Sequence, residues 1–574
     1  MTLWPFSRRE RVLSVGCPYE TGAQWPDAAF SRTEQAQYPD RGQLTDGHTA
    51  SAAVKDPAWT GFLRQGGRFV QIDLGAVRHV ASVAVGCLHS GPAGILPPVC
   101  VFVYASQDGH AWHRVGQACE QPAWYVEPPQ RRQFVIAANT NARFVRVQFT
   151  ARVYVFLDEC TVVGHDEAVT PTQEVTGPSL TDLVGNGFLV DPAALDITDL
   201  VPDRFPTATR HGSLQAARSS GSPLSESAHE IEPGRWLQTS DENAGGIHHM
   251  LLIYSGSADA NSVWAQGDFL PLLQYVPSQT GTPARLFDSF LFTPHGKLET
   301  SAAAWVHWLD DLFGSGRQLH ALDADVAATL EAAHPTRVVL ALPGTTASPR
   351  DFGQLNDAEP HLHFDPAASG QSAAAIDKRR ALTWLVDSLV TRFAEQRFAH
   401  LKLAGLYWQP ESQNLKDPYD EWLIREVADA VHGHGLRFYW IPFYGAAGIT
   451  HARALGFDAV MIQPGAAFHW DIDAPSRLQA SARQAQYYNM GMEIEMHWDI
   501  IHPSDAGRRA TALSLYKEYL SQASRCGYDG AVCKAYYANA KTLLQSARSP
   551  EPTLREAYDL TARFILDSAR HQDS

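Results

Sequence analysis

The chain is 574 residues long, with 45% hydrophobic and 10% aromatic residues, a composition typical of a globular protein with room for two or more domains. It carries 46 basic and 62 acidic side chains, giving a formal net charge of −16. This charge argues against nucleic acid and anionic membrane surfaces as partners and favours a neutral substrate. Fifteen Trp and nineteen Tyr residues suit carbohydrate, because sugar rings stack on aromatic faces.

The sequence shows no signal for export or membrane insertion. Residues 1–11 are charged but are not followed by the apolar run of a signal peptide, and no segment reaches transmembrane length. The seven cysteines are odd in number and none are spaced as CxxC, so they predict neither a disulfide framework nor a zinc site. We therefore expect a cytoplasmic protein without a metal or cofactor, with secretion left open. No pattern indicates the oligomeric state.

Residues 11–165 are predicted to form a β-sandwich. Short runs in which apolar and polar residues alternate, such as 69–74, 80–85 and 144–149, are separated by Gly, Pro and Asp. This pattern is typical of strands joined by turns.

The same region is similar to the discoidin-type (coagulation factor type C) jelly-roll module. The segments that carry the resemblance are 44–47 (Leu-Thr-Asp-Gly), 56–59, 70–75, 103–109, Trp112 and 143–147. Modules of this kind commonly bind carbohydrate, or sometimes calcium at the loop that holds the Thr-Asp-Gly turn, and the resemblance implies these roles. A module that only braces a neighbouring domain is an equal alternative, because a fold constrains function weakly.

Residues 166–246 are interpreted as a linker, because they are rich in Pro, Gly, Ser, Thr and Asp and have few apolar runs. In residues 247–570, compact apolar strands alternate with helical stretches, which predicts a parallel sheet and, with eight such units, a (β/α)8 TIM barrel. The predicted strands are 250–255, 287–293, 338–343, 401–408, 438–443, 459–463, 491–498 and 530–536. The predicted helices are 301–313, 319–333, 381–394, 420–432, 477–488 and 511–525.

The seventh predicted strand carries acidic side chains on one face. Because side chains alternate along a strand, Glu493, Glu495, His497 and Asp499 share a face opposite an apolar one. Unpaired buried charges cost several kcal/mol, so two inward carboxylates need a reason. The active site of a TIM barrel forms at the C-terminal ends of its strands, and we expect these carboxylates to serve catalysis there.

The fourth predicted strand ends in Tyr-Trp-Gln-Pro-Glu411, which places another carboxylate at the same end of the barrel. A Glu closing strand four and a Glu closing strand seven resemble the clan A retaining glycoside hydrolases, in which the first is the acid/base and the second the nucleophile. Retention requires two carboxyls roughly 5 Å apart, one protonated and one ionised. We predict Glu411 as acid/base and Glu495 as nucleophile, because Glu495 lies roughly 6 to 7 Å nearer the mouth than Glu493.

Other polar and aromatic residues near the strand ends are predicted to contact the substrate. They are Glu493, Tyr254, Tyr407, Gln409, Tyr444, Gln463, His497, Lys534 and Tyr536. Simpler roles stay open for some of these side chains. Glu411 can be a solvated loop residue, Glu493 can pair with Lys534 or Lys402, and Gln463 can be satisfied by backbone groups.

The barrel region also resembles the bacterial family known as domain of unknown function 4855. The resemblance rests on segments 252–254, 268–271, 286–292, 305–313, 405–408, 435–442, 456–464 and 491–495, which follow one another in the family's order. Members often occur with discoidin-type modules and have been suspected of glycoside hydrolysis. They are also often exported, which differs from the compartment expected above.

The predicted function is hydrolysis of an oligo- or polysaccharide by a retaining glycosidase. One alternative is a non-catalytic carbohydrate-binding protein built on a degenerate barrel. Another is a metal-assisted polysaccharide hydrolase or deacetylase in which His249, His469 and His497 bind the metal at the barrel mouth. The sequence does not indicate the sugar, its anomer, or internal against terminal cleavage.

Overall fold

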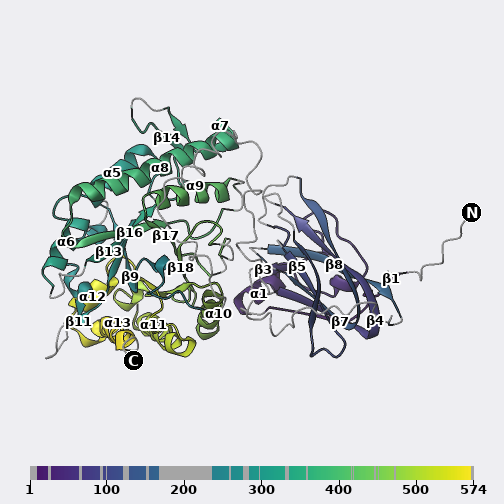
Figure 1. Cartoon of the computed structure of the whole chain (residues 1–574). Helices are drawn as coiled ribbons and strands as arrows, with labels where there is room; N and C mark the ends of the chain where they lie inside the picture. The colour runs from purple at the N-terminus through teal and green to yellow at the C-terminus, as the bar shows by residue number, and fades with distance from the viewer. Residues whose placement is uncertain are drawn as a thin grey trace, which may run out of the picture. The chain divides into compact units, whose positions relative to one another are not determined.

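The chain divides into two compact units, a sandwich and a barrel (Figure 1). The computed structural model describes residues 10–570 except 24–27, 64–67, 91–94, 99, 120–127, 150, 152–153, 167, 169–234, 257–259, 276–283, 297, 330–334, 357–359, 415–416, 418, 445, 447, 450–451, 471–472 and 504. Most of the predicted linker therefore lies outside the described residues. Within those residues, no helix has the length and apolar character needed to cross a membrane.

The N-terminal unit confirms the predicted β-sandwich. Its strands pair antiparallel in the main order β1-β8-β4-β7-β5-β6, with β2 added to β4 and β3 added to β8. They are β1 (Arg11–Val12), β2 (Tyr19–Gly22), β3 (Thr60–Leu63), β4 (Arg68–His89), β5 (Cys100–Ser106), β6 (His113–Cys119), β7 (Gln130–Phe149) and β8 (Tyr154–His165). Helix α1 (Ala28–Gln37) and the 3-10 helix η1 (Gln43–Thr45) lie between β2 and β3.

The sandwich core follows from the alternation in its strands. Val70, Ile72 and Leu74 of β4 are buried in one cluster with Val145 and Val147 of β7, while the residues between them are half-buried. Burial of each such side chain contributes about 1.5–3 kcal/mol. The apolar residues of these paired strands therefore form part of the buried core of the sandwich.

The C-terminal unit confirms the predicted (β/α)8 barrel. Its eight strands are all parallel and form a closed ring, which Figure 1 shows surrounded by helices. They are β9 (His249–Ser255), β12 (Ser289–Pro294), β13 (Thr336–Leu342), β16 (Leu401–Trp408), β17 (Arg437–Trp440), β18 (Ala459–Ile462), β19 (Gly491–Glu495) and β20 (Lys534–Tyr537). All eight predicted strands are present.

The six predicted helices are present, and further elements surround them. The predicted ones are α5 (Ala302–Leu312), α6 (Gln318–Ala327), α8 (Gln371–Gln396), α9 (Asp420–Gly433), α10 (Ala474–Tyr487) and α11 (Ala506–Cys526). The additional helices are α4 (Leu270–Leu273), α7 (Pro366–Ser369), α12 (Thr542–Arg548), α13 (Pro552–Arg570) and the 3-10 helices η7 (Glu242–Ala244), η8 (Ala260–Ser262) and η10 (Trp498–Ile500). Two hairpins pair β10 (Gln274–Tyr275) with β11 (Ala284–Arg285) and β14 (Asp351–Gly353) with β15 (Leu362–His363).

Two strand boundaries differ from the prediction in ways that affect the site. Strand β19 ends at Glu495, and His497 caps the 3-10 helix η10, where its Nδ1 accepts a hydrogen bond from the Asp499 amide (3.1 Å). The alternation of strand seven therefore stops before His497. Strand β20 begins at Lys534, so that Lys534 lies at the N-terminal end of its strand.

Candidate active site

Glu493 and Glu495 project into the barrel, each with 1% of its surface exposed. Glu493 is in register with Ala535 and Glu495 with Tyr537, so these four residues share one face. Burial raises the pKa of Tyr254, Tyr407 and Tyr537, and the charge of Glu493 raises all three further. The three phenols come from β9, β16 and β20, so side chains from three other strands surround Glu493.

Glu495 is held by two donors from outside its own strand. Its Oε2 accepts a hydrogen bond from the Gly465 amide (2.7 Å) and another from the Tyr519 hydroxyl of α11. The same hydroxyl accepts from the Ala466 amide (3.0 Å), which orients it toward the carboxylate. Gly465 has φ of 72°, a conformation that glycine adopts without strain, so a glycine at this turn permits the contact.

Gln463 connects the ends of two strands. Its side chain hydrogen-bonds to the carboxyl groups of both Glu411 and Glu493. An amide nitrogen has two hydrogens and can serve two carboxylates at once. The backbone of Gln463 is fixed as well, because its amide donates to Pro442 O (2.9 Å) and its carbonyl accepts from the Tyr444 amide (2.6 Å). Glu411, which follows strand four, and Glu493 of strand seven thus both approach the side chain of Gln463.

The three carboxyls differ in how firmly they hold a proton. Burial raises the pKa of Glu493 well above its usual range, and the charges of Glu495 and Glu411 raise it further. Burial also raises the pKa of Glu495, to about 7, although the bonds from Tyr519 and Gly465 oppose this. Glu495 is therefore the more easily ionised of the two carboxyls on β19.

Glu411 lies at the open end of the site. The residue as a whole is exposed, yet the protein atoms packed around its carboxyl raise its pKa by desolvation, against the bond from Gln463. Its charge also raises the pKa of Glu493 and of Glu495. All three carboxyls are therefore electrostatically coupled within one site.

The remaining predicted contacts divide into those near the carboxyls and those elsewhere. Tyr254 and Tyr537 approach each other through their hydroxyls (3.5 Å), and buried Tyr407 is influenced by the charges of Glu411 and Glu493. Tyr444 is buried beneath the Arg477 guanidinium, 4.8 Å from its ring centroid. Gln409 is half-buried and its amide donates to Leu342 O (3.2 Å) at the end of strand four.

Lys534 and Tyr536, predicted as substrate contacts, lie away from the carboxyls. They are in register with Met492 and Ile494, and therefore face the opposite side of the sheet from Glu493. The Lys534 ammonium donates to Gly530 O (2.8 Å) and Val532 O (2.7 Å), and the Tyr536 hydroxyl meets His249 Nδ1 (2.7 Å). Both side chains therefore bond to groups on the face opposite Glu493, and Lys534 does not pair with Glu493.

The alternative metal site built on His249 is not formed. His249 is the first residue of β9 and therefore lies at the N-terminal end of the barrel strands, where it bonds to Tyr536. His497 instead follows the C-terminal end of β19. The length of a strand separates these two imidazoles, so they cannot share an ion at the mouth.

Aromatic side chains gather beside the carboxyls, and we call this group the aromatic cluster. Phe468 lies 5.6 Å from Tyr537 and 5.4 Å from His497, measured between ring centroids. The His497 ring is tilted against the Trp498 ring, with centroids 4.0 Å apart, and lies 5.1 Å from the Trp470 ring. Trp498 is 44% exposed, and among the described residues it is the one large aromatic side chain that is exposed. His497 thus supports neighbouring rings as well as capping η10.

The barrel region matches one protein family over its whole length. The model of a family described as domain of unknown function (DUF4855) matches residues 249–563, more than half of the chain. The chain belongs to this family. No curated protein matches it.

Solved structures of small modules are similar to about a quarter of this chain of the DUF4855 family. They include a fucose-binding module of Streptococcus pneumoniae (15% identity, 28% of this chain and 99% of that one, TM-score 0.20). Chitosan-binding module 1 of a chitosanase/glucanase from Paenibacillus sp. IK-5 is 12% identical, with 27% and 99% covered and a TM-score of 0.19. The lectin domain of lectinolysin complexed with Lewis B antigen is 16% identical, with 26% and 94% covered and a TM-score of 0.18.

Three residues that bear on Glu495 in this DUF4855 barrel were not predicted. Tyr519 and Gly465 donate to its carboxylate, and the Arg477 charge lowers its pKa, opposing the larger effect of burial. Arg477 and Tyr519 lie on α10 and α11, and Gly465 on a loop after β18. No local motif marks them, because they meet Glu495 only through the packing of the helices on the barrel.

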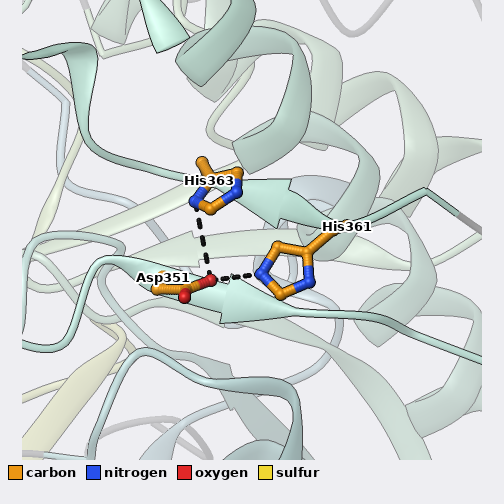
Figure 2. Close-up of side chains that lie close together, drawn as sticks. All are labelled: Asp351, His361 and His363. Atoms are coloured by element: carbon orange, nitrogen blue, oxygen red, sulfur yellow. Dashed lines mark hydrogen bonds and ion pairs between the residues drawn. The ribbon is translucent and has the colours of Figure 1, made fainter. Parts of the chain in front are cut away.

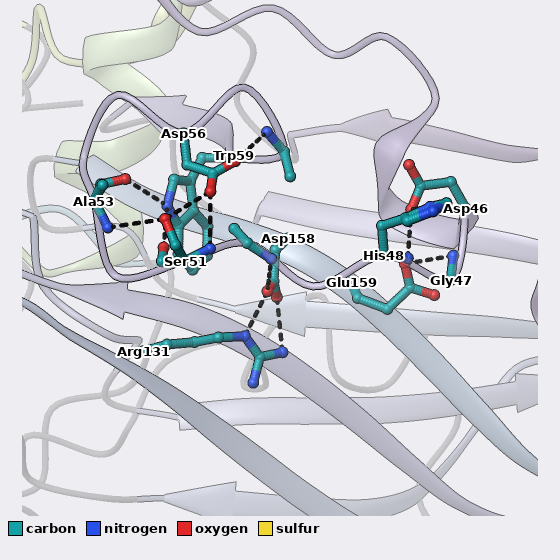
Figure 3. A network of polar contacts seen from close by, with 12 residues as sticks. Asp46, Gly47, His48, Ser51, Ala53, Asp56, Trp59, Arg131, Asp158 and Glu159 are labelled. Carbon is teal, nitrogen blue, oxygen red and sulfur yellow. Dashed lines mark hydrogen bonds and ion pairs between the residues drawn. The ribbon is translucent and has the colours of Figure 1, made fainter.

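The Thr-Asp-Gly turn of the sandwich has an acidic neighbour (Figure 3). Glu159 Oε2 accepts a hydrogen bond from the Gly47 amide (3.1 Å), while its buried Oε1 has no hydrogen-bond partner among the described residues. Burial raises the pKa of Glu159 to about 7, and the charge of Asp46 contributes. An orphaned carboxylate oxygen beside an acidic turn fits calcium, which prefers oxygen ligands. Glu159 and Asp46 would hold the ion, whose charge would replace the proton.

The rest of that network braces the sandwich. Asp158 accepts from the Ala50 amide (2.9 Å) and from Arg131 Nε (2.5 Å), and Asp56 binds the Ser51 amide (2.9 Å) and hydroxyl (2.7 Å), as Figure 3 shows. The buried Trp59 donates from Nε1 to the carbonyls of Ser51 and Ala53. The predicted segment 56–59 is therefore a packing element of the sandwich.

Proposed function

We propose that the barrel is a glycoside hydrolase that acts on an oligo- or polysaccharide with retention of configuration. The observation that carries the proposal is the coupled set of Glu411, Glu493 and Glu495 at the ends of strands four and seven, with Gln463 between two of them. Glycosidic cleavage needs one carboxyl that gives a proton and one that stabilises or attacks the anomeric carbon.

Glu495 suits the nucleophile because two fixed donors stabilise its ionised form. Its carboxylate would attack the anomeric carbon and form an ester to the sugar while the leaving oxygen takes a proton from Glu411. Glu411 would then remove a proton from water, whose oxygen displaces Glu495 and releases the sugar. The raised pKa of Glu411 and its position at the open end of the site support its role as the acid.

Glu493 suits the role of a protonated, uncharged residue next to Glu411 and Glu495. Its Oε2 is buried without a hydrogen-bond partner among the described residues, and two other carboxyls surround it, so the protonated form is favoured. In a second assignment, Glu493 is the nucleophile. This assignment is favoured because the Gln463 side chain hydrogen-bonds to both Glu493 and Glu411, which brings Glu493 close to the proposed acid. Substitution of each carboxyl separately distinguishes the two assignments.

The aromatic cluster supports a sugar as the substrate. Trp498 exposes its ring next to His497 and Phe468, and Phe468 connects through Tyr537 to Tyr254 beside Glu493. Flat aromatic rings next to carboxyls provide the stacking and hydroxyl contacts that a sugar requires. In the described part of the sandwich, by contrast, the exposed large hydrophobic residues are all valines.

A panel of natural and synthetic glycans, incubated with the full-length protein and followed by NMR, tests the proposal. We expect hydrolysis with the first-formed product retaining the anomeric configuration of the substrate. Glu411→Gln and Glu495→Gln should each abolish hydrolysis and keep sugar binding. The control Glu426→Gln, at an ion pair of α9 with Arg379, should leave hydrolysis unchanged. Binding by the wild type without any hydrolysis would instead identify a non-catalytic carbohydrate-binding barrel, and inversion would refute the retaining mechanism.

A further inference from the structure

A short hairpin between β13 and α8 projects three potential metal ligands. Its strands β14 and β15 pair antiparallel, with Asp351 opposite His363. Phe352 and Phe364 are buried and stack on each other at 4.7 Å, and Phe352 meets the edge of Trp305 in α5 at 4.9 Å. This apolar side fixes the hairpin to the barrel's helices.

The polar side of the hairpin gathers Asp351, His361 and His363, which we call the hairpin triad (Figure 2). Asp351 Oδ1 contacts His361 Nε2 and lies 3.5 Å from His363 Nδ1. The three ligand atoms all lie within 4.8 Å of one another. Figure 2 shows one carboxylate oxygen facing a ring nitrogen of each imidazole. Within the described residues, this is the one group of three or more such side chains that converges in this way.

The spacing of the hairpin triad explains its convergence. His361 and His363 are two residues apart, which places both imidazoles on one face of an extended segment. Their ring centroids are 4.6 Å apart. This His-x-His pair has a spacing found among metal ligands, and pairing of β15 with β14 adds the Asp351 carboxylate.

An ion pair of Asp351 needs only one imidazole, whereas nitrogens of two rings face the same carboxylate oxygen here. Two neutral imidazoles and a carboxylate are instead a donor set for a borderline-soft divalent cation. Zinc binds such atoms at about 2.0–2.2 Å, which separates ligand atoms in a tetrahedral site by roughly 3.3 Å. Small side-chain rotations would bring the hairpin triad to that spacing.

We propose that Asp351, His361 and His363 bind a zinc(II) ion, with water completing its coordination. The side chains of these residues are 62%, 48% and 41% exposed, so solvent can reach the open positions. The ion would connect β14 to β15 in the loop that follows strand three of the barrel. Nothing in this proposal depends on the function proposed above.

Isothermal titration calorimetry of the chelator-treated full-length protein with zinc chloride tests the proposal. We expect the wild type to bind one zinc ion per chain. Each of the variants His361→Ala, His363→Ala and Asp351→Asn should lose this ion or bind it at least tenfold more weakly. His434→Ala is the matched control, because His434 Nε2 pairs with Asp387 (2.8 Å) as an exposed couple. Its affinity for zinc should equal that of the wild type.

Cobalt(II) provides an independent readout of the same site. We expect a visible absorption band on addition of cobalt that zinc removes and that His361→Ala abolishes, with unchanged circular dichroism showing that the variant folds. The proposal is overturned if wild-type protein binds no zinc. It is also overturned if zinc binding and the cobalt band are the same in all three variants as in the wild type, since the ions would then occupy other histidines.

Discussion

The Tyr519 hydroxyl of helix α11 donates a hydrogen bond to Glu495 Oε2 at the end of β19. A donor to a carboxylate stabilises the ionised form, so it counteracts the burial that raises the Glu495 pKa to about 7. If Glu495 is the nucleophile, activity requires its ionised form and rises with pH through about 7. Tyr519→Phe should raise this pKa further, by about one unit, and move the acid limb of kcat/KM to higher pH.

The control for this experiment lies one turn away on the same helix. Tyr516 is also a buried phenol, but its hydroxyl bonds to Thr561. Tyr516→Phe should therefore leave the acid limb in place even if it reduces stability. A Tyr519→Phe enzyme whose activity is lower by the same factor at every pH would show that the phenol does not set the ionisation of Glu495.

Glu493 and Glu495 should respond differently to replacement by Gln. If Glu493 is already protonated, Gln is close to it in shape and charge, and Glu493→Gln should keep kcat within about tenfold of the wild type. Glu495→Gln removes the nucleophile and should reduce kcat on the order of a thousandfold or more. Steady-state kinetics of both variants and azide rescue, in which an added anion attacks in place of the carboxylate, would check this. The reverse order of effects would make Glu493 the nucleophile.

Trp498 should affect substrate binding more than chemistry. Its exposed ring lies in the aromatic cluster beside His497. Loss of one stacking contact costs about 1 kcal/mol, so Trp498→Ala should raise KM roughly fivefold with little change in kcat. Trp498→Phe should restore most of the affinity. An unchanged KM across substrates of increasing length would exclude this ring from the binding surface.

Glu159 should make the sandwich less stable as pH rises. Its pKa in the folded protein, about 7, exceeds the usual value, so folding favours the protonated form. That stability is fully present below the pKa of the unfolded chain and is lost as pH rises through about 7. Added calcium should oppose this loss, because a cation replaces the proton.

Thermal unfolding of the full chain at pH 6 and pH 8, with calcium or chelator, measures this effect. Glu159→Gln should remove both the pH dependence and the calcium response of the sandwich transition. Glu20→Gln, at an exposed residue that accepts from Gln71, serves as the control. A calcium response that survives in Glu159→Gln would place the ion elsewhere.

The fold was accessible from the sequence because its signals are local. Buried parallel strands such as β13 are nearly continuous apolar runs, and helices such as α5 begin at a capping residue, here Ser301, whose side chain accepts from the Ala304 amide (3.2 Å). The hairpin of β14 and β15 was not predicted, because its strands of three and two residues are too short to show a period.

The site was less accessible, because the inward face of a strand depends on register. Lys534 and Tyr536 are two residues apart and so share one face of their strand, but this spacing does not say which face points into the barrel. Pairing of β20 with β19 decides this and turns Ala535 and Tyr537 toward the carboxyls instead. The predicted contacts failed at Lys534 and Tyr536 for this reason.

The sequence by itself determined that the chain folds as a sandwich followed by a barrel, and that acidic residues end strands four and seven, because periodicity and composition act over short distances. Only the tertiary structure decided that Gln463 joins Glu411 to Glu493 and that Tyr519 reaches Glu495. These contacts connect elements far apart in the chain. The ionisation of each carboxyl depends on them, since burial and neighbouring groups set a pKa.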